Sequence, residues 1–442
     1  METEARDAST AEPASEVESG ADSESESVIP EVFLARSGSD YATIDEALQE
    51  VLRAIRQHMG MEVAFISEFV AGERTFRYVD RDEDAPAIEV DSGEPIEGSY
   101  CMRVVDGRLP QIIPDAWELR AAEEIPATRA VPVRAHLSVP IRLSNGQIYG
   151  TFCCFSTTPD PSLDRRDLAV MRVFADFAAR QIERRSVIVS ERHAARERIQ
   201  GVLDERGLYM LAQPVFAIGD SAPVGFEALA RFSSGPLRPP DQWFEEARRV
   251  DLHEDLTALA VDEAVNSLER LPGSASLSIN IEPDAVISGE AGRLLARADA
   301  RRIVLELTES RRVEDYDHLR SELAHLRSLG IRIAIDDFGA GYASMRHVLE
   351  LRPDLVKLDR SIVSDVDQDG DRRALVAAIV AFAEETGTRV VAEGVEKVSE
   401  LEQLVAMGVD RYQGYLLGRP MPIVDCADYR LPDDLAPVLA AA

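Results

Sequence analysis

The second half of the chain alternates short apolar stretches with helical segments, and this alternation strongly constrains the fold. Eight apolar stretches follow one another from about residue 205 onward. They read LYMLAQPVF, VGFEALARF, ASLSINI, IVLELTE, IRIAIDD, LVKLD, RVVAE and RYQGYLL. Eight strands separated by helices over roughly 230 residues predict a (β/α)8 barrel. No sequence repeat of roughly 20 to 50 residues accompanies them, which excludes a solenoid.

Each expected strand ends in a polar residue. These residues are Gln213, Glu227, Asn280, Glu306, Asp336 with Asp337, Lys357, Glu393 and Gln413. In a β/α barrel the carboxyl ends of the strands converge on one mouth, where active sites of this fold are built. From Glu227 to Gln413 the successive gaps are 53, 26, 30, 21, 36 and 20 residues, mostly one strand and one helix each. We therefore expect these side chains to meet.

The carboxylates of this series predict a divalent-cation site. Crowded at one mouth, they would repel one another and raise one another's pKa unless cations were present. All the donors are oxygens, without histidine or cysteine, which favours Mg²⁺ or Mn²⁺ over zinc or copper. A single acid at a strand end is more often a helix cap or an ion-pair partner, but four strand ends sharing one mouth are a different case. Asp336 and Asp337 are consecutive, so both reach one site only where the strand is ending.

Lysine is rare in this chain, and one of its lysines lies in the series. Of the 48 basic residues only Lys357 and Lys397 are lysines. A position that needed only positive charge would almost always carry arginine here, so Lys357 indicates a need for a compact ammonium group. Chance is the alternative, since Lys397 occurs without evident need.

The first half of the chain predicts an α+β domain followed by a long helix. Apolar residues recur at helical spacing from Ile44 to Ile55, and a strand-rich stretch follows. Asn145-Gly146 between two strands predicts a type I′ hairpin. From Asp164 to Gln200 the pattern is helical without proline or glycine. Such a helix serves as a signalling rod or a dimer seam, and a solvated connector is the alternative.

Charge and composition narrow the partners and the compartment. The first 27 residues carry nine acids against Arg6, which predicts a disordered tail and does not fit a signal peptide. The formal charge of -32 would repel nucleic acids and anionic membrane surfaces, so neither is expected as a partner. No apolar run is long enough to cross a bilayer, so no membrane insertion is expected. Four cysteines, with Cys153 and Cys154 adjacent, make no disulfide framework, which favours the cytoplasm.

The strand ends also carry a series of short motifs. They are Gln213-Pro214, Glu227-Ala228-Leu229 with Ala230-Arg231, Glu306-Leu-Thr-Glu309, Asp336-Asp337-Phe-Gly-Ala-Gly-Tyr342, Lys357-Leu-Asp359, Glu393-Gly-Val-Glu396 and Gln413-Gly-Tyr-Leu. The series covers roughly residues 200 to 430 and resembles the signature of the EAL-domain phosphodiesterases of cyclic di-GMP. The resemblance implies a barrel with one antiparallel strand that hydrolyses cyclic di-GMP to linear pGpG with two Mg²⁺ or Mn²⁺ ions.

The resemblance also implies roles for these residues. The first metal would be held by Glu227, Asn280, Glu306 and Asp336, and Asp337 would help to place the second. The second metal's water would be oriented by Glu393 and Gln413, with Glu393 as general base, and Lys357 would neutralise the reacting phosphate or its nucleophile. The substrate would be contacted by Gln213, Leu229, Arg231 and Gln413, and Glu309 would brace the glycine-rich loop. One departure is Ala343, where the family commonly has a serine. It leaves the order of that loop open.

The front half resembles a GAF domain. The resemblance rests on a terminal helix and on Ser99-Tyr-Cys101, Asp106-Gly-Arg-Leu-Pro110, Asn145-Gly146 and Phe152-Cys-Cys-Phe155. It implies a sensor that binds an unidentified small molecule, or one that only dimerises, and a homodimer is expected. The expected divisions are an acidic tail (1–38), a GAF-like domain (39–163), a signalling helix (164–200), a phosphodiesterase barrel (201–432) and a C-terminal tail (433–442).

Three functions compete for the barrel. The first is a sensor-regulated phosphodiesterase, and the second is a receptor that binds cyclic di-GMP without cutting it. A receptor should have lost a metal ligand or the lysine, and none is lost here. The third, an enzyme acting on another phosphorylated substrate, is disfavoured by the ending from Gln413 to Arg419.

Overall fold

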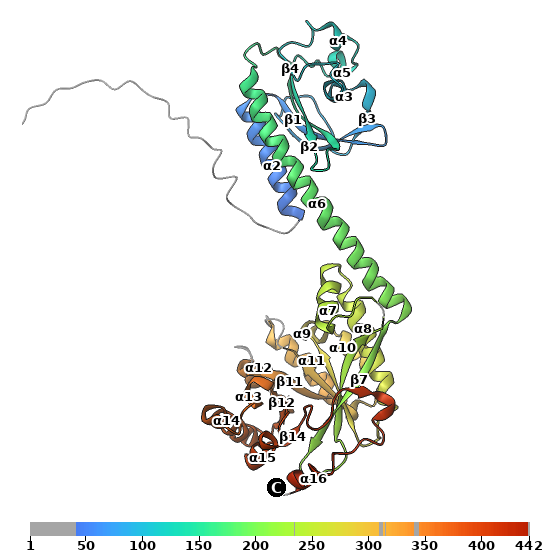
Figure 1. Ribbon diagram of the computed structural model, residues 1–442, viewed down its shortest axis with the longest axis vertical. Helices are drawn as coiled ribbons and strands as arrows, with labels where there is room; N and C mark the ends of the chain where they lie inside the picture. Colours follow the sequence, from blue (N-terminus) through green and yellow to red (C-terminus); the bar gives the residue numbers. More distant parts are fainter. Residues whose placement is uncertain (1–40, 234, 309–312, 314, 340–343, 441–442) are drawn as a thin grey trace, which may run out of the picture. The chain divides into compact units, whose positions relative to one another are not determined.

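The computed structural model describes residues 41–233, 235–308, 313, 315–339 and 344–440 (Figure 1). The chain divides into two compact units, Met1–Ile188 and Val189–Ala442. Among the helices that the structure describes, none combines the length and the apolar character needed to span a membrane.

The first unit is built on one antiparallel sheet in the order β3-β2-β1-β6-β5-β4. Its strands are β1 (Val63–Val70), β2 (Glu73–Arg81), β3 (Gly93–Pro95), β4 (Ile112–Ile113), β5 (Ala135–Arg142) and β6 (Ile148–Ser156). One face packs against α2 (Tyr41–His58) and the first half of α6 (Arg165–Glu205), because both helices carry an apolar stripe. The other face is covered by three short helices, α3 (Tyr100–Val105), α4 (Arg120–Glu123) and α5 (Ala127–Ala130). The turn η1 (Ile96–Gly98) precedes α3 and has no buried residue.

The hairpin between β5 and β6 forms as expected, but its turn is not type I′. A type I′ turn needs positive φ at both central residues, and here only Gly146 has one, at 84°. Gly146 N–H donates to the Leu143 carbonyl, so Ser144 and Asn145 are the central residues of the turn. Gly146 follows them in the left-handed position, because the loop is longer than the two-residue loop that Asn-Gly favours.

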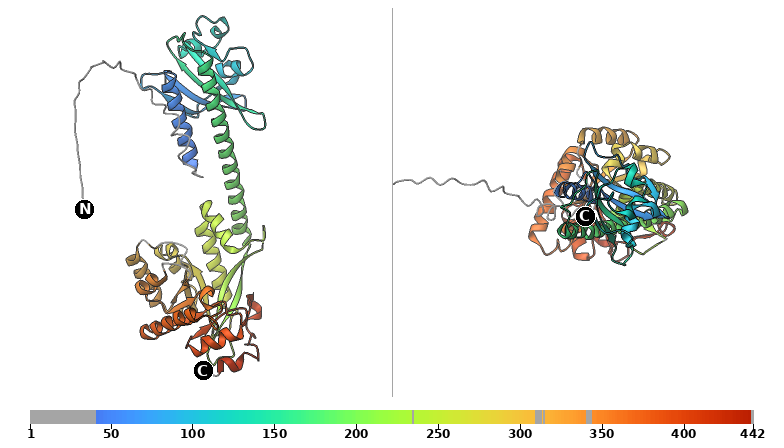
Figure 2. Two further views of the ribbon diagram at one scale, coloured as in Figure 1. Left: turned by 60° about the vertical axis from the view of Figure 1, so that its left-hand side comes forward. Right: turned by 90° about the horizontal axis from the view of Figure 1, so that it is seen from above.

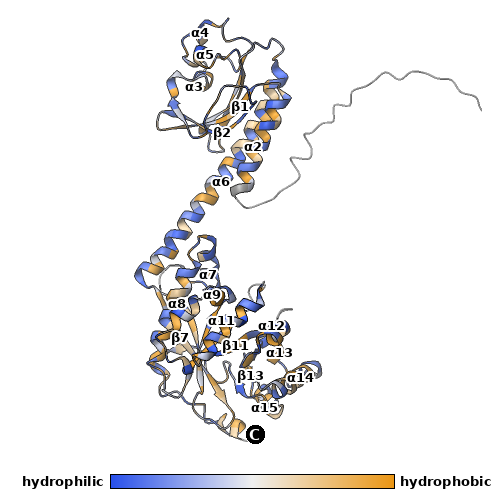
Figure 3. Ribbon diagram, turned by 180° about the vertical axis from the view of Figure 1, so that it is seen from behind, coloured by the Kyte–Doolittle hydropathy of each residue, from blue (hydrophilic) through white to orange (hydrophobic). Residues whose placement is uncertain are grey.

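Helix α6 is a single helix of 41 residues. Hydrophobic and hydrophilic residues alternate along it (Figure 3). It ends at Glu205, five residues beyond the end that the sequence predicted. Gly201 does not stop it, because Ile199 and Val202 on either side are buried in the core of the second unit.

The second unit is a closed eight-stranded barrel, which confirms the predicted fold class. The strands are β7 (Leu208–Ala217), β8 (Gly225–Phe232), β9 (Ser276–Ile281), β10 (Ile303–Leu307), β11 (Arg332–Phe338), β12 (Leu355–Leu358), β13 (Arg389–Ala392) and β14 (Arg411–Tyr412). Strands β8 to β14 pair in parallel, while β7 runs antiparallel to both β8 and β14 and closes the barrel. A short strand, β15 (Met421–Pro422), pairs with the edge of β7.

Helices surround the strands of this unit (Figures 1 and 2). They are α7 (Pro240–Arg249), α8 (His253–Leu268), α9 (Pro283–Ile287), α10 (Glu290–Leu295), η2 (Ala300–Arg302), α11 (Tyr316–Ser328), α12 (Ser344–Leu351), α13 (Arg360–Val363), α14 (Gly370–Thr386), α15 (Val398–Ala406), η3 (Ile423–Asp425) and α16 (Ala436–Ala440). A separate apolar cluster contains Val215 of β7, Val304 of β10 and Val391 of β13, together with Ala334 and Leu355 of the strands between β10 and β13. The polar strand ends are therefore held by a packed barrel.

Candidate active site

The polar strand ends meet around Lys357. Its ammonium lies 2.7 Å from Glu306 Oε2, 2.6 Å from Glu393 Oε1 and 3.0 Å from Asp336 Oδ1. Glu227 Oε2 lies 3.6 Å away. The side chain of Lys357 is only 3% exposed. The buried Lys357 ammonium is therefore the point on which β8, β10, β11, β12 and the end of β13 converge, as the spacing predicted.

Amide side chains hold the carboxylate of Glu227 from two sides. Asn280 Nδ2 donates to its Oε1 at 3.0 Å, and Gln413 Nε2 donates to its Oε2 at 2.6 Å. Gln213, paired with Glu227 in the β7–β8 register, donates to the Gly418 carbonyl. The hydrogen bonds from Asn280 and Gln413 thus fix the orientation of the Glu227 carboxylate.

Asp336 and Asp337 reach the same site because the backbone departs from the strand between them. The β11–β12 register is irregular between Ile335 and Phe338, and Asp337 has a φ of 51°. This left-handed conformation is uncommon outside glycine and is tolerated best by aspartate and asparagine. Carboxylate oxygens of Asp336, Asp337 and Glu393 consequently come within 4.8 Å of one another.

Burial and crowding raise the pKa values of Glu306, Asp337 and Glu393. Burial, with the charges of Glu227 and Asp336, raises the pKa of Glu306 to about 8, although Lys357 opposes the shift. Burial, with the charge of Asp336, raises the pKa of Asp337 to about 6. Burial also raises the pKa of Glu393 well above its usual value. Within the described part of the chain, one ammonium at this mouth faces five carboxylates and does not balance them.

The donor set fits a divalent cation. Asn280 Oδ1 and Gln413 Oε1 are buried and accept no hydrogen bond from any described residue. A buried acceptor without a donor is costly, and a cation removes that cost. Carboxylate and amide oxygens without nitrogen or sulfur suit Mg²⁺ or Mn²⁺. The carboxylates of the site therefore outnumber its positive charge, and two amide oxygens remain available to bind a cation.

A pocket of about 310 Å³ opens onto these groups. Besides the expected residues, it is lined by six that the sequence did not single out as site residues: Asp359, Arg360, Gly394, Glu396, Gly414 and Tyr415. Asp359 and Glu396 were visible as members of the quoted motifs. Tyr415 was likewise visible as a member of the motif that begins at Gln413. Arg360 pairs with Glu396 at 3.0 Å, and no pattern in the sequence marks Arg360.

Two expected substrate residues lie in a neighbouring pocket. Leu229 and Arg231 line a cavity of about 540 Å³ between β8, β9, α7 and α8, which Asn280 also lines. The Arg231 guanidinium donates to the Ala230 carbonyl at 2.8 Å. Asn280 therefore links this cavity to the acidic mouth. Glu309 and Ala343, for which the sequence also gave expectations, lie outside the described residues.

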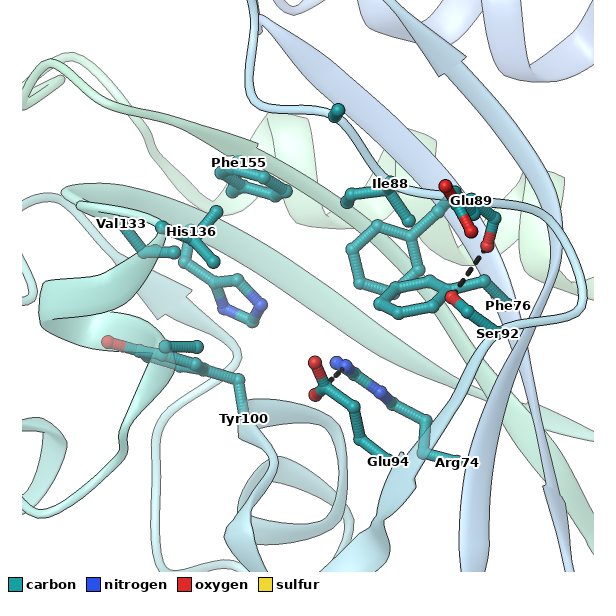
Figure 4. A pocket seen from close by; sticks show the side chains of 14 residues that line it. Arg74, Phe76, Ile88, Glu89, Ser92, Glu94, Tyr100, Val133, His136 and Phe155 are labelled. Atoms are coloured by element: carbon teal, nitrogen blue, oxygen red, sulfur yellow. Dashed lines mark hydrogen bonds and ion pairs between the residues drawn. The ribbon is translucent and has the colours of Figure 1, made fainter.

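The first unit contains a separate pocket of about 300 Å³ (Figure 4). Aromatic side chains, among them Phe76 and Phe155, line it together with Arg74, His136 and Glu94. His136 is 2% exposed, and its Nδ1 has no hydrogen-bond partner among the described residues. The sequence did not predict this pocket, because Arg74 and His136 are isolated polar residues within strands.

Comparison with known proteins assigns both units. The EAL domain family matches residues 196–420, and the GAF domain family matches residues 43–182. A bifunctional diguanylate cyclase/cyclic di-GMP phosphodiesterase, MucR from Pseudomonas aeruginosa, is 31% identical over 236 residues, 51% of this chain and 34% of its own. The cyclic di-GMP phosphodiesterase PdeF from Escherichia coli is 29% identical over 265 residues, 56% of this chain and 35% of its own.

The chain thus spans about a third of the length of these curated relatives. A solved structure of the EAL enzyme Bd1971, in a form bound to cAMP and cyclic di-GMP, is 18% identical with a TM-score of 0.50. The match covers 82% of this chain and 91% of the Bd1971 chain, and it shows a similarity of fold alone.

Proposed function

Because the chain belongs to the EAL domain family and also carries a GAF domain, as its motifs predicted, we propose that it is a sensor-regulated phosphodiesterase that hydrolyses cyclic di-GMP to linear pGpG. The observation that carries the proposal is the acidic mouth, where the Lys357 ammonium contacts Glu306 and Glu393 and Asn280 donates to Glu227. The substrates named for the relatives MucR and PdeF support the choice of cyclic di-GMP.

We assign the binding of two divalent cations to the oxygen donors of this mouth. Glu227, Asn280, Glu306 and Asp336 would hold the first, and Asp337 would help to place the second. Bound there, Mg²⁺ or Mn²⁺ would neutralise the phosphodiester and make a water acidic enough to attack near neutral pH. The excess of carboxylates over ammonium groups, and the acceptor left free on Asn280, support this assignment.

The side chains have distinct roles in this proposal. Glu393 accepts the proton of the attacking water, and burial, which raises the pKa of this carboxylate, makes it a stronger base. Gln413 orients that water, and Lys357 offsets negative charge on the reacting phosphate. Gln213, Leu229 and Arg231 contact the nucleotide, with Arg231 able to hold a phosphate with two donors once it releases the Ala230 carbonyl.

We further propose that the enzyme acts in the cytoplasm as a homodimer with α6 as the seam. Val173 and Val187, which lie two heptads apart on α6, are 56% and 55% exposed. A partner helix would cover both. The pocket of the first unit would hold the sensor's small-molecule ligand, and the free cysteines are in keeping with a reducing compartment.

The test is product analysis with the purified full chain. With Mg²⁺ or Mn²⁺, cyclic di-GMP should be converted to linear pGpG, and Glu227→Ala or excess chelator should abolish the reaction. Calorimetry under the same conditions separates the alternative: binding of cyclic di-GMP without any product would identify a receptor. Full turnover in excess chelator would overturn the metal assignment.

A further inference from the structure

Two cysteine thiols face each other inside the first unit. Cys101 on α3 and Cys153 on β6 are both fully buried, and their sulfur atoms are 3.7 Å apart. The two residues are 52 positions apart in the sequence. This distance is van der Waals contact, and a modest movement of α3 toward the sheet would bring the sulfur atoms to bonding distance.

The surroundings of the two thiols differ in a way that suits reaction between them. Cys101 Sγ accepts from Arg74 Nη1 at 3.7 Å and from the Ser67 hydroxyl at 3.8 Å. Cys153 Sγ contacts two hydroxyl groups and donates to Thr151 Oγ1 at 3.1 Å. One sulfur is thus surrounded by donors, which stabilises a thiolate, and the other remains a thiol.

The charge of Arg74 reinforces this difference. Although burial opposes ionisation, the hydrogen bond from Cys153 and the charge of Arg74 lower the pKa of Cys101 to about 5. Burial and the neighbouring Cys101 raise the pKa of Cys153 well above its usual value. A thiolate beside a protonated thiol is the arrangement that thiol–disulfide chemistry uses.

Arg74 also connects the thiols to the cavity of the first unit. Its guanidinium lines the pocket of Figure 4, where it pairs with Glu94, a residue 56% exposed. The same guanidinium donates to the sulfur of Cys101. A small neutral oxidant that enters this pocket is therefore one side chain away from the thiolate.

We propose that Cys101 and Cys153 form a redox-active pair that a hydroperoxide converts reversibly to a disulfide. The Cys101 thiolate attacks one peroxide oxygen, the O–O bond breaks, and the departing hydroxide takes up a proton to leave as water. The resulting sulfenic acid is attacked by the sulfur of Cys153, which loses its proton, and a second water leaves. Two thiols are oxidised by two electrons in total, and one hydrogen peroxide is reduced to two waters.

Cys154 provides a matched internal control. It is adjacent to Cys153 and equally buried, but it points to the other face of the sheet, where its sulfur contacts Met171 at 3.9 Å. Burial raises the pKa of Cys154 far above its usual value, although the charge of Arg56 opposes the shift. If burial alone decided reactivity, Cys153 and Cys154 would be equally unreactive. The proposal instead makes Cys153 reactive and Cys154 unreactive.

The experiment treats the reduced full chain with hydrogen peroxide, unfolds it, alkylates the remaining thiols and maps the peptides by mass spectrometry. A peptide pair linked through Cys101 and Cys153 should form first and disappear with dithiothreitol. Cys154→Ser should not change its rate of formation. In Cys153→Ser the disulfide cannot form, and dimedone should instead label Cys101 as a sulfenic acid.

Arg74→Met should slow oxidation of Cys101 on the order of tenfold, because less of the thiolate is present, and Arg74→Lys should restore most of the rate. Failure of both cysteines to oxidise in the folded wild type, or equal oxidation of Cys154, would overturn the proposal. Should Arg74→Met fail to fold, the dimedone labelling of Cys153→Ser decides the question independently.

Discussion

Lys357 is one of two lysines in a chain that otherwise uses arginine, and its ammonium lies within 3.6 Å of four carboxylates. Burial opposes its charge, but these carboxylates outweigh burial and raise the pKa of Lys357 well above its usual value. The side chain is fully enclosed by strand ends. A planar guanidinium, which is larger and carries its donors in a fixed fork, would displace at least one of the carboxylates.

We therefore expect Lys357→Arg to fold but to lose turnover on the order of 100-fold, the loss typical of displacing one electrostatic contact to the transition state. Lys397→Arg is the matched control. Lys397 is 49% exposed and pairs with Asp365 at the surface, so its replacement should leave kcat unchanged. The measurement is kcat at saturating Mg²⁺. Near wild-type turnover of Lys357→Arg would contradict the role assigned to the ammonium.

A second expectation at this scale concerns His136 and pH. Burial, aided by the charge of Arg74, lowers the pKa of His136 from 6.5 to about 3. The unfolded chain binds this proton near pH 6.5 and the folded chain does so only near pH 3, so the unfolded state binds more protons between these values. Stability of the first unit should therefore fall as the pH drops through this window, by a few kcal/mol.

The check compares the pH dependence of the unfolding free energy in wild type and His136→Phe. Carboxylates titrate in both proteins, so the difference between the two curves isolates the histidine. The wild-type curve should be the steeper below pH 6.5, and parallel curves would show that His136 is protonated in the folded state.

The gathering of site residues could be predicted from sequence, because parallel barrel strands end at one mouth. Glu227, Glu306 and Lys357 meet for this reason alone. The left-handed backbone at Asp337 and the position of Arg231 in a neighbouring pocket could not be predicted. Both depend on how one strand is offset against the next, and no local pattern encodes that offset.

At the scale of single elements, the long periodic segments followed their sequence patterns and the short ones did not. The longer strands of the barrel, such as β7 and β8, and the helices α2 and α6 have enough residues to show a period. Helices α3, α4 and α5 are six residues or fewer, too short for a period, and tertiary contacts determine them. The pocket and the thiol pair of the first unit lie beneath these short helices, so the sequence did not reveal them.

Two glycines give opposite expectations for the same substitution. A Cβ on Gly150 in β6 would lie 1.8 Å from the Ser67 carbonyl oxygen in β1, so the strands would have to separate. We expect Gly150→Ala to destabilise the first unit by about 3 kcal/mol. A Cβ on Gly201 in α6 would meet no atom within 4 Å, and Gly201→Ala should stabilise that helix by roughly 0.5–1 kcal/mol.

Hydrogen exchange of the full chain can measure both effects in one molecule. Peptides of β1 and β6 should exchange faster in Gly150→Ala, and peptides of α6 near residue 201 should exchange more slowly in Gly201→Ala. Unchanged exchange in β1 would mean that the sheet accommodates the methyl group and that the close approach is not essential.

At the scale of the whole molecule, α6 begins in the first unit and ends in the core of the second. If α6 is the seam of a dimer, its heptad phase carries the signal from sensor to barrel. An insertion of four residues between Ser190 and Glu191 should then change turnover roughly fivefold or more. An insertion of seven residues, which nearly keeps the phase, should change it much less. Equal effects of the two insertions on kcat would identify α6 as a passive connector.

The closing strand of the barrel has a consequence for how the protein is made. Arg411 and Tyr412 of β14 pair with Ala217 and Phe216 of β7, so the barrel joins segments roughly 200 residues apart. On the ribosome β7 emerges long before β14, and at about 5–20 residues per second the intervening chain takes about 10 to 40 s to synthesise. Throughout that interval the free edge of β7 is open to strands of other nascent chains. Translation speed between these two strands therefore sets how long each new molecule is exposed to misassembly.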